Sequence, residues 1–272
     1  MSEANKNEMT FLEHLEELRW HLVRSLLAVM LFGLLAFVFK YIVFDIIVLG
    51  PSKQEFFTNR WLCLLGQEFL KSDKLCINSD PILLQNIQMA GQFMAHIKIS
   101  LIAGIVVAFP YIFYEFWRFI RPALYAKEQK MARGAVLTIS FLFFLGVFFG
   151  YYVICPLSIN FLTNYQVSDL AINNIKLMSY VSLVASICLA AGILFELPMI
   201  VYFLSKLGLL TPEFLKKYRK HALVVILVLA AIITPPDIFS QILVSLPMLL
   251  LYEISIVISK RIVQKQKAEL QG

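Results

Sequence analysis

The stretch Ser179–Ser205 reads SYVSLVASICLAAGILFELPMIVYFLS and contains one charged residue, Glu196. A helix of this length crosses a hydrocarbon core about 30 Å thick. At about 1.5 Å per residue, Glu196 lies roughly 15 Å from Lys206, the first charge beyond the stretch, and so near the middle of the core. An ionisable group there usually faces a bundle interior or a water-filled cavity. We interpret Glu196 as a functional polar site; the alternative is a protonated, purely structural glutamic acid.

The composition places the whole chain in a membrane. Hydrophobic residues make up 60% of the 272 residues and charged residues 15%, whereas soluble domains carry about 25% charged residues. The apolar residues gather into spans rather than one core, which predicts an all-α integral membrane protein with six transmembrane helices in a single polytopic domain, 1–272. The predicted spans are 22–47, 97–117, 135–159, 179–205, 222–234 and 240–259.

The fifth span is short, and a tight turn joins it to the sixth. Only Thr234-Pro235-Pro236-Asp237-Ile238-Phe239 separates the two spans, which predicts a helical hairpin. A fifth span of this size reaches about 20 Å. We therefore expect short fifth and sixth helices, with the hairpin tip buried in protein or lining a cavity.

The distribution of lysine and arginine predicts the orientation. Basic residues are more numerous, and in shorter loops, on the side that carries both chain ends. The positive-inside rule then makes segments 1–21 and 260–272 cytoplasmic and 48–91 an outer loop. The first span is longer than the apolar core of a signal peptide, and no transit peptide precedes it, which favours a retained anchor in a bacterial inner membrane. The net charge of +6 reflects this topology and requires no nucleic acid.

Cysteines and histidines indicate no metal site or cofactor. Cys63 and Cys76 share the outer loop, where an oxidising compartment would allow a disulfide; two free thiols are the alternative. Cys155 and Cys188 lie in spans and are interpreted as small buried side chains. No His/Cys cluster has metal-ligand spacing, and no phosphate loop or nucleophile motif is present, so we expect no cofactor and no enzyme activity.

Two cytoplasmic segments combine acidic and apolar residues. Thr10–Leu22 reads TFLEHLEELRWHL, which predicts a short interfacial helix with Glu13 and Glu17 on the face opposite its leucines. In the segment after the second span, Glu128 is the only carboxylate among the basic residues between Arg118 and Arg133. Taken alone, each feature is explained by a solvated face or a local salt bridge.

Together, the ordered motifs resemble the TatC family, the core subunits of twin-arginine protein translocases. The resemblance runs from about residue 10 to 260. Two departures stand out: the first outer loop is long and carries Cys63 and Cys76, and Arg121 replaces a small apolar residue. The motifs are HLEELR (14–19), FIRPALY (119–125) with Glu128, FELP (195–198), LTP (210–212) and TPPDIFSQ (234–241).

The resemblance implies a six-helix, concave, glove-shaped receptor that exports folded proteins using the proton-motive force. Signal peptides with paired arginines would bind at the cytoplasmic face. The implied partners are TatA- and TatB-type single-span proteins, and we expect a homo-oligomer within a larger complex. The expected signal-peptide residues are Glu17, Glu128, Arg19, Phe119 and Leu124. Gln241 and Asp237 are the expected partner contacts.

Two other functions were weighed. A proton-coupled secondary transporter of small solutes would also place a carboxylate near the bilayer centre. It should, however, show internal repeats and paired broken helices, and no convincing repeat relates the halves of this chain. An intramembrane enzyme would need a nucleophile and base or a metal triad, and neither is visible in the sequence.

Overall fold

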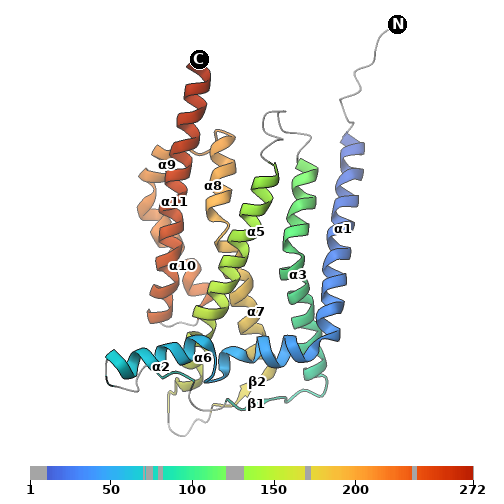
Figure 1. The fold of residues 1–272 in the computed structure, drawn as a ribbon, viewed down its shortest axis with the longest axis vertical. Helices are drawn as coiled ribbons and strands as arrows, with labels where there is room; N and C mark the ends of the chain where they lie inside the picture. Colours follow the sequence, from blue (N-terminus) through green and yellow to red (C-terminus); the bar gives the residue numbers. More distant parts are fainter. Residues whose placement is uncertain are drawn as a thin grey trace. The chain divides into compact units, whose positions relative to one another are not determined.

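The computed structural model describes residues 11–69, 71, 76–78, 82–120, 132–168, 173–234 and 238–271. The chain forms two compact units: residues 1–40 with 97–140, and residues 41–96 with 141–272. Apart from two strands of two residues each, the regular elements of the described part are helical (Figure 1). The prediction of an all-α membrane protein is confirmed.

Five helical segments of the described chain are long and apolar enough to cross a membrane: Glu16–Val38, Gly91–Ile120, Gly134–Asn164, Leu177–Lys206 and Gln241–Gln266. The expected short fifth span corresponds to α10, Arg219–Ile233, which has 15 residues. At 1.5 Å per residue it measures about 22 Å, less than the core of a bilayer. The sixth helix, α11 (Ile238–Gln271), is longer than expected because its 34 residues extend through the basic C-terminal segment.

The first unit contains α1 (Phe11–Val38), most of α3 (Gly91–Ile120) and the start of α5 (Ala132–Phe149). We expected a short interfacial helix over Thr10–Leu22 that leads into the first span; in its described part this segment is continuous with the span, since α1 runs without a break from Phe11 to Val38. Thr10 lies outside the described residues. No glycine or proline interrupts α1 before Gly33, so nothing in the sequence ends the helix at the interface.

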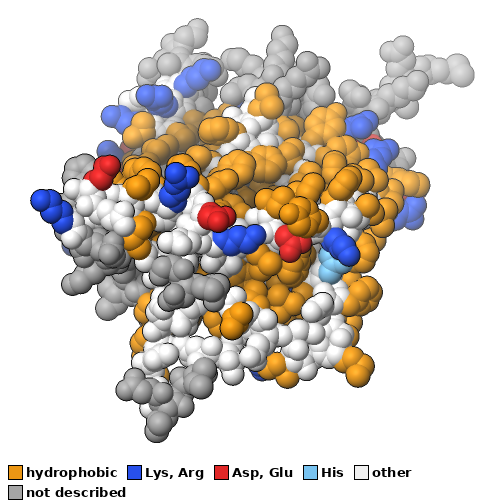
Figure 2. All heavy atoms as spheres, turned by 60° about the horizontal axis from the view of Figure 1, so that its bottom comes forward, with side chains coloured by type: hydrophobic (Ala, Val, Ile, Leu, Met, Phe, Trp, Pro, Cys, Tyr) orange, Lys and Arg blue, Asp and Glu red, His pale blue; other side chains and the backbone are white. Residues whose placement is uncertain are grey.

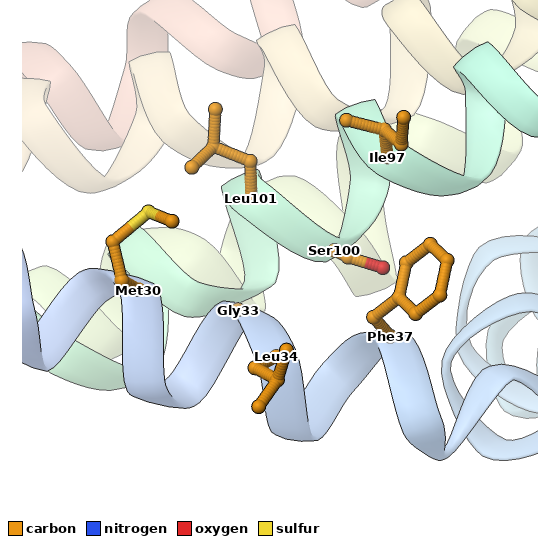
Figure 3. Close-up of a pocket in the computed structure, with 7 residues that line it drawn as sticks. All are labelled: Met30, Gly33, Leu34, Phe37, Ile97, Ser100 and Leu101. Carbon is orange, nitrogen blue, oxygen red and sulfur yellow. The ribbon is translucent and has the colours of Figure 1, made fainter.

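Two glycines allow α1 and α3 to approach closely. A Cβ added to Gly104 would lie 2.7 Å from the backbone nitrogen of Gly33 and 2.7 Å from the carbonyl oxygen of Val29. Small residues permit this kind of backbone contact between membrane helices. Beside the crossing lies an open apolar groove of about 180 Å³ (Figure 3). Its lining residues are Met30, Gly33, Leu34, Phe37, Ile97, Ser100 and Leu101.

The first helix ends earlier than the predicted first span, and the second unit begins just after that end. The span was predicted to reach residue 47, but α1 stops at Val38 and a separate π-helical segment, η1, covers Tyr41–Val48. A 3-10 turn, η2 (Gly50–Ser52), and a helix in the predicted outer loop, α2 (Phe57–Phe69), follow. Within this unit α2 lies across the direction of α10 and α11 (Figure 1).

The remaining elements of the second unit form a helical bundle. Helix α5 continues through a π-helical turn, η5 (Gly150–Ile154), into α6 (Cys155–Asn164). Strands β1 (Leu84–Gln85) and β2 (Ile175–Lys176) pair in parallel just before α7 (Leu177–Leu194). Helices α8 (Leu197–Lys206) and α10 both pack on α11, with α9 (Pro212–Lys217) beside them.

The packing of this bundle combines apolar contacts with satisfied polar groups. Val201, Leu215 and Ile256 form a buried cluster. The Oγ of Ser205 donates a hydrogen bond of 2.8 Å to the Oγ of Ser259, joining α8 to α11. Outside such contacts, many large hydrophobic side chains are exposed, and they cover much of the face seen in Figure 2. An exposed apolar surface of this extent is suited to lipid rather than to water.

Candidate functional site

Glu17 lies on the face of α1 that turns toward α3. In the turn 16–20 it is the only half-buried residue, while Glu16, Leu18, Arg19 and Trp20 are exposed. No ion pair reaches Glu17 from the described residues. Arg19, which we expected at the same site, instead lies on the exposed side, with its Nη2 3.8 Å from Oε1 of Glu16. The structure therefore separates Glu17 and Arg19 onto different faces of one helix.

One turn further along α1, a buried ion cluster joins it to α3. The Nδ1 of His21 lies 2.5 Å from Oε2 of Glu115, and the Nη1 of Arg24 lies 3.8 Å from the same oxygen. Tyr111, one turn earlier on α3, also hydrogen-bonds the Glu115 side chain. Only 3% of the Glu115 side chain is exposed, so these partners compensate the cost of burying a carboxylate.

Glu115 was not among the site residues predicted from the sequence. It lies inside the predicted span 97–117, and this carboxylate within an apolar stretch was the signal that could have identified it. Its partner His21 is 94 residues away in the sequence, so local spacing could not predict the pair.

Phe119 is the one residue of the predicted FIRPALY site that the structure describes near this cluster. Its ring centroid lies 6.1 Å from that of His21, in an edge-to-face arrangement. Helix α3 ends at Ile120, one residue later. Leu124 and Glu128, the other predicted residues from this segment, lie outside the described residues.

Glu196 occupies a break in the fourth span. Helix α7 ends at Leu194 and α8 begins at Leu197, so Glu196 is the residue that precedes α8, with Pro198 in its first turn. Pro198 lacks a backbone N–H, which favours an interruption of the helix at this point. The carboxyl group lies beside the backbone of Phe143 on α5. Its Oε1 is buried and has no hydrogen-bond partner among the described residues.

Gln241 joins the two helices of the hairpin. Its Nε2 donates a hydrogen bond of 3.1 Å to the carbonyl oxygen of Leu227 on α10. Asp237, the second predicted partner contact, falls outside the described residues, as do Pro235 and Pro236. The Gln241 amide thus has an intramolecular partner within the hairpin.

The predicted disulfide is present in the outer loop. Cys63 of α2 is bonded to Cys76, with a separation of 13 residues. Asn78 lies two residues beyond it and donates from Nδ2 to the carbonyl oxygens of Pro51 (3.3 Å) and Pro156 (3.2 Å). The bridge therefore joins α2 to a segment that contacts both η2 and α6.

The described side chains include no group of three or more His, Cys, Asp or Glu placed to hold a metal ion. The structure places one half-buried carboxylate, Glu17, near the start of α1, and a second, Glu196, at the break between α7 and α8. Five described helical segments are long and apolar enough to span a membrane. The fold and its polar groups define a multi-pass α-helical membrane protein.

Comparison with known proteins identifies the family. Residues 13–247 match the family model described as "Sec-independent protein translocase protein (TatC)". The chain belongs to the TatC family of protein translocase components. One relative is the TatC protein of Blattabacterium sp. subsp. Periplaneta americana, which is 44% identical over 96% of this chain and 98% of the relative. Another is the TatC protein of Aquifex aeolicus, which is 36% identical over 95% of this chain and 98% of the relative.

Solved structures agree with this assignment. The chain is similar to a structure described as "Crystal Structure of Twin Arginine Translocase Receptor- TatC", with a TM-score of 0.68 and 35% identity over 92% of this chain and all of the other. A second TatC structure, described as in DDM, gives a TM-score of 0.69 at the same identity, covering 91% and 99%. The family and the all-α membrane fold predicted from the sequence are confirmed.

Proposed function

We propose that this chain is the receptor and core subunit of a twin-arginine translocase, and that Glu17 binds an arginine of the signal peptide. The observation that carries the proposal is the state of Glu17: half-buried, on the α3-facing side of α1, and without an ion-pair partner among the described residues. A carboxylate in that state is available to a guanidinium, whose planar fork it can accept through two hydrogen bonds.

The second arginine would bind Glu128, which follows Phe119 in the same motif. Two carboxylates on separate segments would read an arginine pair as a pair. An exposed ion pair contributes only about 0–1 kcal/mol, so recognition needs partial desolvation. Phe119, held at 6.1 Å from the ring of His21, and Leu124 are suited to supply it.

Binding of a labelled signal peptide to the purified protein in nanodiscs tests this proposal. Glu17→Ala and Glu128→Ala should each weaken binding by roughly tenfold, since each removes a charge-assisted contact. Glu17→Arg and Glu128→Arg should be weaker still. Glu16→Ala is the matched control, because Glu16 lies on the same turn but is exposed. A twin-lysine peptide should bind less well than twin-arginine.

Unchanged binding by both alanine variants would place the site elsewhere. Equal binding of the twin-lysine peptide would exclude bidentate recognition while leaving the location in place.

The wider role follows from the same proposal. The subunit would sit in a bacterial inner membrane with both termini in the cytoplasm, assemble with further copies and with TatA- and TatB-type single-span proteins, and export folded proteins using the proton-motive force. The α10–α11 hairpin is a suitable partner surface because Val225, Val228 and Leu246 are each more than half exposed. Photocrosslinkers at these positions should capture a single-span partner; crosslinks confined to α5 would move the contact.

A further inference from the structure

The cluster around Glu115 contains the two side chains of α1 that could otherwise pair with Glu17 and compete with an arginine of the signal peptide. Glu17, His21 and Arg24 occupy positions i, i+4 and i+7 of α1, and therefore share one face of the helix. Glutamate followed by a cation four residues later is the favourable order for a pair within a helix. On α1 by itself, the side chains of His21 and, one turn beyond it, Arg24 would thus lie on the Glu17 side of the helix, within reach of its carboxylate.

The structure shows a different pairing. Both His21 and Arg24 contact Oε2 of Glu115 on α3, at 2.5 Å and 3.8 Å. The Glu115 side chain is 3% exposed, that of His21 12% and that of Arg24 44%. A buried carboxylate attracts cations more strongly than an exposed one because the surrounding dielectric is lower. Glu115 therefore holds the His21 ring and the Arg24 guanidinium toward α3.

We propose that Glu115 is a positioning residue of the signal-peptide site, which keeps His21 and Arg24 away from Glu17 and so leaves Glu17 free for an arginine of the signal. This inference rests on the proposed function. Glu115 itself does not contact the signal, because its carboxylate is buried and already occupied by His21, Arg24 and Tyr111.

Loss of the Glu115 charge has two consequences. Arg24, nearly half exposed and on a long side chain, is released toward Glu17 and toward the incoming peptide. There it competes for the carboxylate and repels the arginines of the signal. The ring of His21 also loses the bond that holds it against Phe119. The first effect is electrostatic and screened by salt; a loss of fold would not be.

The experiment measures binding of a fluorescent twin-arginine signal peptide to the full chain in nanodiscs. Glu115→Gln should weaken binding about fivefold at roughly 0.05 M salt, and the difference from the parent should shrink at roughly 0.5 M, where the Debye length is only a few ångströms. Adding Arg24→Gln should return the affinity to within about twofold of the parent, since the released cation is gone. Glu16→Gln, on the same turn of α1 as Glu17, is the matched control and should bind like the parent.

Parent-like binding by Glu115→Gln would overturn the inference. So would a loss that Arg24→Gln does not rescue, or one that salt leaves unchanged, because both indicate a structural role. Glu115→Asp is the second variant if Glu115→Gln fails to insert or unfolds. It retains the charge but moves it away from α1, so it should weaken binding less, with the same dependence on salt and the same rescue by Arg24→Gln. A different pattern counts against the inference. Glu17→Ala is measured alongside. Unchanged binding there refutes the proposed function, whereas a loss there with none at Glu115 refutes only this inference.

Discussion

Glu196 combines two properties that rarely occur together in a membrane span. It sits where the helix is interrupted, between Leu194 and Leu197. Its Oε1 is buried without a hydrogen-bond partner in the described chain. A structural glutamic acid would be expected to satisfy both oxygens within the protein. The unsatisfied oxygen favours the interpretation that Glu196 contacts a partner helix or a bound signal peptide.

Substitution at Glu196 should therefore affect transport more than folding. Glu196→Ala removes a poorly satisfied buried carboxyl group, so the thermal midpoint in detergent should change little. Export of a twin-arginine substrate in cells, or recovery of partners with the tagged protein, should fall several-fold. Glu196→Gln is the companion variant: full export by Gln would mean that hydrogen bonding suffices. Normal export and normal partner recovery in the alanine variant would contradict the assignment.

Among single residues, the sequence predicted a charge isolated within an apolar stretch but missed a charge whose partners are distant in the sequence. Glu196 was visible because the rest of Ser179–Ser205 is uncharged. Glu115 was missed because it lies near the end of its apolar stretch, close to Arg118, where charges are common. Its significance depends on His21 and Arg24 from another helix, and no local pattern encodes that contact.

Among the elements, the crossing of α1 and α3 depends on Gly104. A methyl group there would come within 2.7 Å of backbone atoms of Gly33 and Val29, and backbone cannot move aside as a side chain can. Gly104→Ala should force the helices apart and destabilise the protein by about 1–3 kcal/mol, the usual cost of overpacking. The measurement is the thermal midpoint in detergent.

Gly134→Ala is the control for Gly104→Ala. Gly134 is also helical, but a Cβ at that position meets nothing within 4 Å. Alanine is favoured over glycine in a helix by up to about 1 kcal/mol, so this variant should be as stable as the parent or more so. Equal midpoints for Gly104→Ala and the parent would show that the two helices are not closely packed at the crossing.

The outer loop depends on the Cys63–Cys76 bond. A loop of this size gains about 3 kcal/mol from a disulfide in the loop-entropy model. The bonded segment also places Asn78, which hydrogen-bonds Pro51 and Pro156. Replacing both cysteines with serine should lower the thermal midpoint, and reductant should lower that of the parent but not of the variant. Alkylation of both thiols in the untreated parent would show that the bond does not form.

The predicted boundaries of the helices agreed with the structure only where the apolar stretch ended at a clear sequence signal. The fourth span was predicted from composition, and the missing backbone N–H of Pro198 favours the break within it. The outer loop was predicted only as a loop, yet it contains α2, whose 13 residues have one buried face and one exposed face. The end of α1 at Val38 was missed because the residues after it are mostly apolar through Val48, with only Lys40 and Asp45 charged.

For the whole molecule, two independent physical arguments agree on the orientation. Lysine and arginine are concentrated in the loops predicted to be cytoplasmic, which the positive-inside rule explains. The disulfide lies in the loop predicted to be outside, and such bonds persist in oxidising compartments. Reversing the chain would place the basic loops outside and the disulfide in a reducing cytosol.

Single-cysteine labelling of whole cells tests the predicted topology. Met89 and Val167, both highly exposed, lie on predicted outer segments, and Leu209, 70% exposed, on a predicted inner one. Met89→Cys and Val167→Cys should react with an impermeant maleimide in intact cells. Leu209→Cys, Ser2→Cys and Gln264→Cys should react only after the membrane is disrupted. The native cysteines give a low background because Cys63 and Cys76 are bonded and Cys155 and Cys188 are buried. Labelling of Ser2→Cys or Gln264→Cys in intact cells would place a terminus outside, and Glu17 could not then meet a cytoplasmic signal peptide.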